Sequence, residues 1–196
     1  MKYSEACPKT IQDIFHNVET ALLAGGEQRD NVIKRMGAYT GMNNGDFAFY
    51  FADIFVESVQ YGSRTELCQL MDKIEKMPFN DQLDAINGQA QTAGVAPSDY
   101  CRHALSNTTI ISSPGRPWTY QYCTEFGWYQ TPSEEHPMRS TKLLSYDYWV
   151  DMCKSIYGVD LQINRTIAEF SFDHIAATNT VFTNGIDDPW QWATEL

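Results

Sequence analysis

The chain has 196 residues, of which 43% are hydrophobic and 13% aromatic, which is enough to form the core of one domain, or of one domain and part of another. The formal net charge of −11 and the pI near 4.6 argue against binding to nucleic-acid phosphates or to anionic membrane surfaces. No apolar run is long enough to cross a membrane, and residues 1–8 lack the apolar segment of a signal peptide.

The spacing of apolar residues predicts helices along most of the chain. Ile11, Ile14, Val18 and Leu22 fall on one face of a helix that begins near residue 4 and ends at the glycine pair 25–26. A mainly α-helical body is therefore expected from about residue 4 to residue 158. We predict its further helices over residues 27–36, 47–61, 63–78, 80–93, 98–105 and 146–157.

Polar residues mark three of the expected helix starts. Asn43 lies in a loop that favours an N-cap, Ser63 and Glu66 have the spacing of a capping box, and Asn80 can cap the helix that follows it. The helix over residues 47–61 is the most hydrophobic of the set. Its aromatic stripe could also line a ligand site, but packing at the centre of the core is the better interpretation.

The chain beyond residue 105 is less regular. Residues 106–116 and 131–139 are typical of loops, and residues 118–130 are rich in aromatic side chains without helical periodicity. Residues 181–183 are β-branched or aromatic and predict a short strand, which a turn at Asn184-Gly185 would end. Pro189 suits the first turn of a helix, so Asp188 is either its N-cap or a functional carboxylate beyond the end of the strand.

Cysteines and sequons suggest a protein of the secretory pathway. Asn107 and Asn164 each begin an Asn-x-Thr sequence and are candidate glycosylation sites. The five cysteines are widely spaced and form no C-x-x-C pair, so no zinc site is predicted: Cys7, Cys68, Cys101, Cys123 and Cys153. No other spacing of metal ligands occurs, and we predict neither a metal nor a cofactor.

Two sequence blocks together carry a resemblance to a known family. The first runs Trp118-x-Tyr120-Gln121-x-Cys123-Thr124-Glu125-Phe126-Gly127-x-Tyr129-Gln130, and the second runs Phe182-Thr183-Asn184-Gly185-x-x-Asp188-Pro189-Trp190. In this order and at this distance they resemble the prolyl-specific serine carboxypeptidases, a family that contains lysosomal Pro-X carboxypeptidase, dipeptidyl peptidase II and thymus-specific serine protease. The segments around Ala52-Asp53, residues 59–62 and Leu67-Cys68 are similar to the same proteins, so the resemblance covers nearly the whole chain.

The resemblance implies an α/β-hydrolase fold with an inserted helical cap. On that basis residues 1–160 would form the cap, a helical bundle, and residues 161–196 a partial hydrolase segment with one strand of the sheet. Asp188 falls on the aspartate of a Ser–Asp–His triad, where it would hold and stabilise the imidazole. Trp190 and Trp128 fall on or near positions of the apolar pocket for the proline of the substrate, although ordinary packing is the alternative for both.

The resemblance also implies two disulfides, Cys7–Cys68 and Cys123–Cys153, which leave Cys101 without a partner. The resemblance also implies that proline-containing peptides would be the partners of the full-length enzyme. We expect no nucleic-acid or membrane partner, and the oligomeric state, monomer or homodimer, stays open. The parent enzyme would be secreted or reside in a lysosomal or vacuolar lumen, and its choice between carboxypeptidase and dipeptidyl peptidase activity also stays open.

Other triad residues of the family have no counterpart in the sequence. No Gly-x-Ser-x-Gly pattern occurs, and all four histidines precede Asp188 and match no family motif: His16, His103, His136 and His174. We therefore assign no nucleophile and no base. We expect an internal or truncated portion of a serine exopeptidase that is inactive alone, the alternative being a non-catalytic helical binding module in which Asp188 is only an N-cap.

Overall fold

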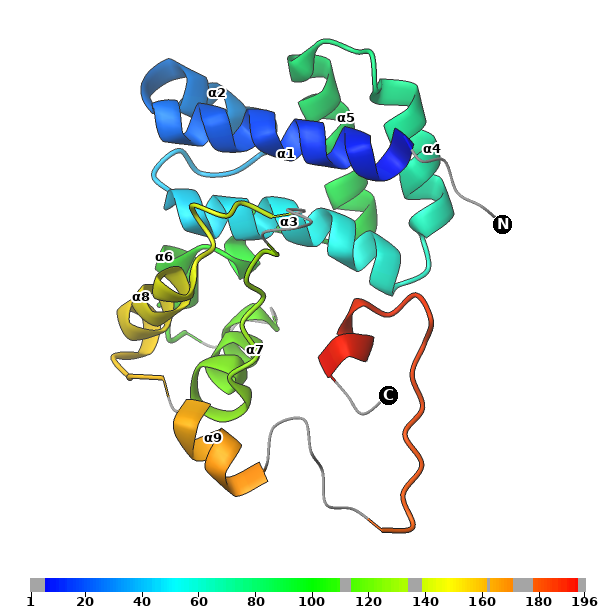
Figure 1. Ribbon diagram of the computed structural model, residues 1–196. Helices are drawn as coiled ribbons and strands as arrows, with labels where there is room; N and C mark the ends of the chain where they lie inside the picture. The colour runs from blue at the N-terminus through cyan, green and yellow to red at the C-terminus, as the bar shows by residue number, and fades with distance from the viewer. Residues whose placement is uncertain (1–5, 110–113, 134–138, 162, 171–177, 194–196) are drawn as a thin grey trace.

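The computed structural model describes residues 6–109, 114–133, 139–161, 163–170 and 178–193. These residues are mainly helical (Figure 1), as predicted, and no β-strand occurs among them. In chain order the helices are α1 (Ala6–Ala24), α2 (Gly26–Arg35), α3 (Asn44–Gln60), α4 (Arg64–Ile74), α5 (Phe79–Ala93), the 3-10 turn η1 (Pro97–Asp99), α6 (Arg102–Leu105), α7 (Gly115–Gln121), the π-helical turn η2 (Tyr122–Phe126), α8 (Tyr146–Tyr157), α9 (Ile163–Phe170) and the 3-10 turn η3 (Pro189–Ala193).

Helix α3 is the centre of the core. It crosses the middle of the molecule, with α1 and α2 on one side and α6, α7 and α8 on the other (Figure 1). Of its 17 residues, 12 are buried, so it has no solvent-facing side over most of its length. The prediction of a central core helix is confirmed, but the helix is buried more completely than the single apolar stripe indicated.

Aromatic rings join α3 to both of its neighbouring layers. On one side Phe51 packs edge-on against Phe15 of α1, with ring centroids 5.0 Å apart. On the other side Phe49 contacts Tyr100 and Trp149, each with a centroid distance of 4.8 Å. Edge-to-face contacts of this kind stabilise a core beyond the area that they bury, by about 0.5–1.5 kcal/mol each. Phe49 is not on the apolar side that the sequence predicts for this helix, and the second layer explains its burial. That predicted side consists of Phe47, Tyr50, Phe51, Ile54, Phe55 and Val59.

Two disulfides connect elements that are distant in sequence. Cys7 of α1 is bonded to Cys68 of α4, and Cys123 of η2 is bonded to Cys153 of α8. Cys101 is free and buried. These are the two pairs that the family resemblance implies. Because they close loops of 61 and 30 residues, each would stabilise the fold by about 4 kcal/mol if the bond acts mainly through the unfolded chain.

We expect alkylation in denaturant without reductant to modify one thiol per chain, because the other four cysteines are in disulfides. Intact-mass analysis measures this number directly. The same reaction without denaturant should leave Cys101 unmodified, since it is 7% exposed. Five modified thiols in the unreduced, denatured sample would contradict both bonds.

The predicted helix starts are partly confirmed. Asn43 caps α3, with its Oδ1 accepting a hydrogen bond of 2.8 Å from the Gly45 N–H. Ser63 occupies the N-cap position of α4, but its side chain makes no capping hydrogen bond, so the predicted capping box is wrong. The cap of α5 is Pro78 and not Asn80, whose side chain instead accepts a hydrogen bond from Asn31 of α2.

The aromatic segment 118–130 is more helical than predicted. Helix α7 continues into η2, where the wider turn of a π-helix breaks the regular periodicity that sequence analysis seeks. Gly127 ends the turn with a φ of 69°. A Cβ atom there would lie 2.7 Å from Cγ1 of Ile163, so glycine permits both the backbone conformation and the approach of α9.

The strand predicted over residues 181–183 is absent. The chain is extended there in Figure 1, but Val181 is 85% exposed and no described segment pairs with it. A strand needs a neighbouring strand to accept and donate its backbone hydrogen bonds, and the described residues supply none. The turn predicted at Asn184-Gly185 is also wrong, because neither residue has a positive φ and the turn lies at residues 186–187, where the Asp188 N–H donates to the Gly185 carbonyl at 3.1 Å. The division of the chain at residue 160 stays a prediction.

In the part of the chain that the structure describes, none of the helices has both the length and the apolar character needed to cross a membrane.

Candidate functional site

A cavity of about 580 Å³ lies where α3, α7 and η3 meet. Its size is within the range of cavities that bind small molecules or short peptide segments. Aromatic side chains from five parts of the chain form much of its wall: Phe49, Tyr100, Trp118, Tyr122 and Trp190.

The C-terminal segment, residues 178–193, supplies part of the wall of this cavity. Asp188 Oδ1 accepts a hydrogen bond of 2.9 Å from the Trp190 N–H, which makes Asp188 the N-cap of η3. This hydrogen bond fixes the start of η3, and both Asp188 and Trp190 line the cavity. Asp187 does not line the cavity and pairs with Arg64 at the start of α4.

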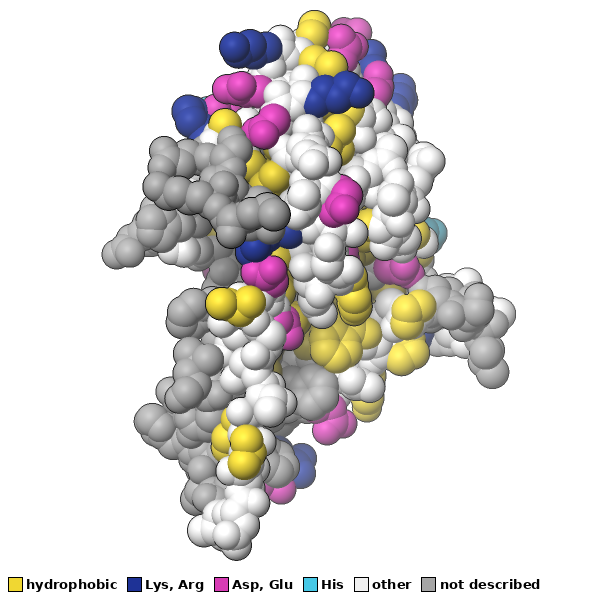
Figure 2. All heavy atoms as spheres, turned by 90° about the vertical axis from the view of Figure 1, so that its right-hand side faces the viewer, with side chains coloured by type: hydrophobic (Ala, Val, Ile, Leu, Met, Phe, Trp, Pro, Cys, Tyr) yellow, Lys and Arg dark blue, Asp and Glu magenta, His cyan; other side chains and the backbone are white. Residues whose placement is uncertain are grey.

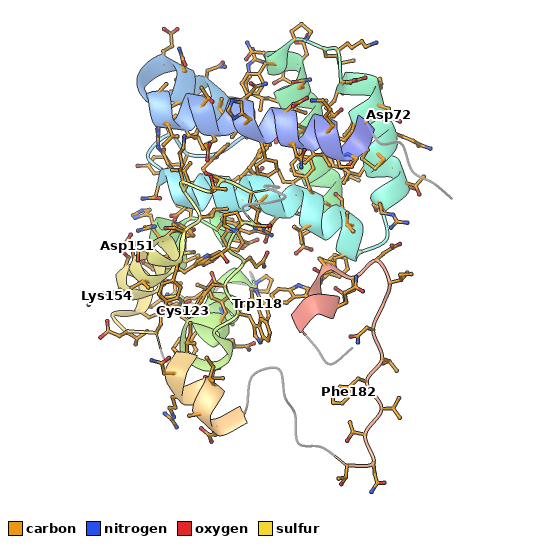
Figure 3. All side chains as sticks on the ribbon, in the orientation of Figure 1. Asp72, Trp118, Cys123, Asp151, Lys154 and Phe182 are labelled. Carbon is orange, nitrogen blue, oxygen red and sulfur yellow. A yellow bond between two sulfur atoms is a disulfide. The ribbon has the colours of Figure 1, made fainter. Side chains whose placement is uncertain are left out.

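Two tryptophans bring the C-terminal segment against the helical body. The ring of Trp118 on α7 contacts the ring of Trp190 edge-on, with centroids 6.4 Å apart. Figure 3 shows Trp118 directed across the gap between α7 and the C-terminal turn. Trp128, the second predicted pocket residue, is half-buried but is not among the residues that line the cavity. Its role in the pocket stays a prediction.

An acidic side chain lies deep in the cavity wall. Asp53 of α3 is 7% exposed and forms an ion pair of 3.1 Å with Arg139. The hydroxyl of Tyr100 also donates a hydrogen bond to Asp53. Burial raises the pKa of the Asp53 carboxyl, and Arg139 offsets part of that rise. Arg139 in turn donates to the side chain of Gln130, another lining residue, so one guanidinium holds two parts of the wall in place.

Glu57 lies one helical turn after Asp53 on the same wall of the cavity. It is half-buried, and no described residue pairs with its carboxylate or donates a hydrogen bond to it. Partial burial, and then the neighbouring charge of Asp53, raise the pKa of Glu57. Among the described residues, neither a positive charge nor a hydrogen-bond donor therefore offsets the negative charge of Glu57.

The C-terminal segment also exposes hydrophobic side chains on the outside of the molecule. Figure 2 shows most of the charged side chains of this face in its upper part, and several hydrophobic side chains in its lower half, where acidic side chains also lie. Exposed hydrophobic residues of the segment include Val181 and Ile186, which are 85% and 89% exposed, and Phe182, which is 42% exposed.

The described histidines and the two candidate glycosylation sites do not line the cavity. His16 and His103 are exposed, and His136 and His174 are outside the described residues. Asn107 and Asn164 are exposed, so glycosylation of both stays a prediction. Among the described residues, no three His, Cys, Asp or Glu side chains are grouped in a way that could hold a metal ion.

Comparison with known proteins decides the family. The family model described as serine carboxypeptidase S28 matches residues 1–195. The chain belongs to the S28 serine carboxypeptidase family. The resemblance drawn from the two sequence blocks is therefore confirmed. No solved structure matched the chain.

Curated relatives of the S28 family come from plants, animals and fungi. Over 97% of this chain, 30% of residues are identical to "Probable serine protease EDA2" of Arabidopsis thaliana, of which the match covers 40%. "Thymus-specific serine protease" of Mus musculus is 33% identical over 44% of this chain and 18% of its own length. "Probable extracellular serine carboxypeptidase" of Arthroderma benhamiae is 30% identical over 57% of this chain and 16% of its own length. The chain thus spans less than half the length of these relatives.

Sequence reasoning did not foresee Glu57 or Trp118 as cavity residues, and it noted Asp53 only as part of a family segment. One signal was available: Asp53 and Glu57 are four residues apart in a stretch, residues 47–57, that is otherwise apolar or aromatic. Acidic residues on such a helix need a partner or a polar cavity, because an isolated buried charge is costly.

Proposed function

We propose that this chain carries the substrate pocket and the triad aspartate of an S28 serine exopeptidase that cleaves next to proline. The observation that carries the proposal is that Asp188 and Trp190 line the same cavity. Asp188 would accept a hydrogen bond from the imidazole of a catalytic histidine and stabilise the imidazolium that forms during attack.

The cavity walls suit a proline side chain. A pyrrolidine ring offers carbon surface and no N–H, so flat apolar partners are its best contacts. Trp118 and Trp190 meet nearly at right angles, with an interplanar angle of 84°, and such a corner can contact a ring on two sides. We assign no nucleophilic serine and no catalytic histidine, so we expect the 196-residue chain alone to hydrolyse no peptide.

The two disulfides of the chain favour an oxidising compartment. One relative is described as an extracellular serine carboxypeptidase, and we propose a secreted or lysosomal location for the parent enzyme of this chain as well. Proline-containing peptides are its proposed partners.

The alternative is a non-catalytic helical module that binds peptides without cleaving them. The capping hydrogen bond from Trp190 to Asp188 favours it, because it gives Asp188 a structural role that needs no catalysis. The two functions predict the same peptide binding but differ in the effect of Asp188 on turnover.

Replacing Trp190 by alanine is expected to weaken binding of Gly-Pro-amide about tenfold, which corresponds to a loss of about 55 Å² of apolar contact. Isothermal titration calorimetry with the purified chain measures the affinity without relying on tryptophan emission. Tyr39→Ala is the matched control and should bind as the wild type does, since Tyr39 is an exposed aromatic side chain that does not line the cavity. Equal affinity of the wild type for Gly-Pro-amide and Gly-Ala-amide would contradict a proline pocket.

A further inference from the structure

The charge of the cavity wall is one-sided. Four carboxylates line the cavity, from Asp53, Glu57, Asp99 and Asp188, and its lining contains no lysine, arginine or histidine among the described residues. Since the cavity is also partly enclosed by aromatic rings, water screens these charges less than it would on an open surface. Such a wall repels a carboxylate ligand and attracts a cation.

Three of these carboxylates already interact with other groups of the protein. Asp53 is paired with Arg139 and accepts a hydrogen bond from Tyr100, Asp188 accepts the capping hydrogen bond from Trp190, and Asp99 also has a partner within the chain. Glu57 is different, because no described residue offers it a cation or a hydrogen-bond donor. Glu57 is thus the lining carboxylate with full capacity for a partner that comes from outside.

The aromatic rings favour the same kind of partner. An ammonium group binds well where a carboxylate and aromatic faces are combined, since the ring faces are electron-rich. Trp118, Tyr122 and Trp190 supply such rings in the cavity that Glu57 lines. Apolar surface for a pyrrolidine ring and a carboxylate for an ammonium group therefore occur within one cavity.

We propose that Glu57 binds the primary ammonium group of a peptide ligand and so makes the cavity selective for cationic over neutral or anionic peptide ends. The proposal deepens the proposed function and rests on it. The ammonium group belongs to the free amino terminus of a peptide or to a lysine side chain, and the two sources share the same chemistry.

Binding of four small peptides to the purified chain tests this assignment by calorimetry at pH 7. Gly-Pro-amide carries an amino-terminal ammonium group, N-acetyl-Lys-Pro-amide carries one on its side chain, N-acetyl-Gly-Pro-amide is neutral, and N-acetyl-Gly-Pro with a free carboxylate is anionic. We expect at least one of the two cationic peptides to bind about tenfold or more tightly than the neutral one, and the anionic peptide to bind most weakly. The cationic peptide that binds more tightly identifies the source of the ammonium group.

Variants at two glutamates then locate the charge. Glu57→Gln keeps the size of the side chain and should remove most of the preference for the ammonium peptides over the neutral peptide. Glu66→Gln makes the same change in net charge on the exposed first turn of α4, outside the cavity, and should keep the full preference. Circular dichroism spectra and melting temperatures of both variants establish that the helical fold is intact.

The possible failures are distinguishable from failure of the proline pocket. Equal binding of ammonium and acetylated peptides, with binding still dependent on proline, would overturn the assignment of Glu57 and leave the proposed function standing. A preference for ammonium that persists in Glu57→Gln would also overturn it. Loss of the proline dependence itself would overturn the proposed function first.

Discussion

Asp188→Asn is expected to lower kcat/KM about 10⁴-fold in a chimera in which residues 1–195 replace the matching stretch of an active S28 peptidase. The expectation follows from the triad role, because an asparagine cannot stabilise the imidazolium and does not hold the histidine in the required tautomer. Steady-state hydrolysis of a proline-containing fluorogenic peptide measures the effect.

The choice of asparagine separates the catalytic role from the structural one. Asparagine is as good an N-cap as aspartate, so the hydrogen bond from the Trp190 N–H to position 188 can be kept. η3 and the wall of the cavity should therefore stay in place while the charge is lost. If Asp188 is only a cap, Asp188→Asn should hydrolyse the peptide as fast as the parent chimera.

Asp187→Asn is the matched control for this experiment. The side chain of Asp187 pairs with Arg64 and does not line the cavity. Because the pair is 35% and 44% exposed, its loss should cost at most about 1 kcal/mol of stability. We expect the control to retain the activity of the parent within about threefold. A large loss of activity in Asp187→Asn, with none in Asp188→Asn, would mean that Asp187 and not Asp188 is the triad aspartate.

Arg102→Met is expected to lower the free energy of unfolding by about 3–5 kcal/mol, the usual cost of leaving a buried charge without its partner. The partner is Asp46 of α3, which is fully buried. Its carboxylate forms an ion pair of 3.0 Å with the guanidinium and accepts the backbone N–H of Arg102 at 2.8 Å. Methionine keeps much of the length of the side chain but removes its charge and donors.

This guanidinium joins three helices. Arg102 begins α6, Asp46 lies in α3, and Asp151, which also pairs with Arg102, lies in α8. The hydroxyl of Tyr148 on α8 donates a further hydrogen bond of 3.3 Å to Asp46. Loss of Arg102 therefore weakens the packing of the second layer on α3 as well as leaving one carboxylate unpaired.

Urea unfolding followed by circular dichroism measures the change, and Arg35→Met is its control. Arg35 pairs with Asp84 at the surface, so its replacement should cost no more than about 1 kcal/mol. Burial already raises the pKa of Asp46 in the wild type, and removal of Arg102 should raise it further.

The pH dependence of Arg102→Met follows from the direction of that shift. An acid with a raised pKa in the folded state binds more protons there than in the unfolded chain, so stability is lost as the pH rises through the raised pKa. The deficit of Arg102→Met should consequently be largest at pH 7 and should shrink as the pH falls towards about 4. A deficit that is small at pH 7, or that is the same at both pH values, would mean that Asp46 does not depend on Arg102.

The helices could be predicted because local sequence determines much of their placement. Apolar spacing located α1, and Asn43 marked the start of α3 correctly. Ser63 failed as a cap because its backbone, with φ −97° and ψ 23°, does not have the extended conformation in which a side chain reaches the first N–H groups of the helix. The strand over residues 181–183 failed for another reason, since pairing depends on partners that local sequence does not reveal.

The candidate site could be predicted only where it lies in the family motif. Asp188 and Trp190 were found through the motif, and the structure brings both to one cavity. Glu57 lies outside the two motif blocks, and its position on the cavity follows from the packing of α3 against η1 and η3. The amphipathic pattern of a single helix predicts that such an acidic side chain faces solvent. Only the packing of the other elements around α3 shows that it faces a cavity.

The attachment of the C-terminal segment has a thermodynamic consequence for anything that binds beside it. The segment returns to the body through the Arg64–Asp187 pair and the ring contact of Trp118 with Trp190. A ligand that touches both Trp118 and Trp190 favours the attached arrangement over any detached one, so occupancy and attachment are linked equilibria. A substitution that loosens the segment lowers the fraction of molecules in which it is attached, and the apparent affinity falls in proportion to that fraction. This holds even when the substituted residue does not contact the ligand.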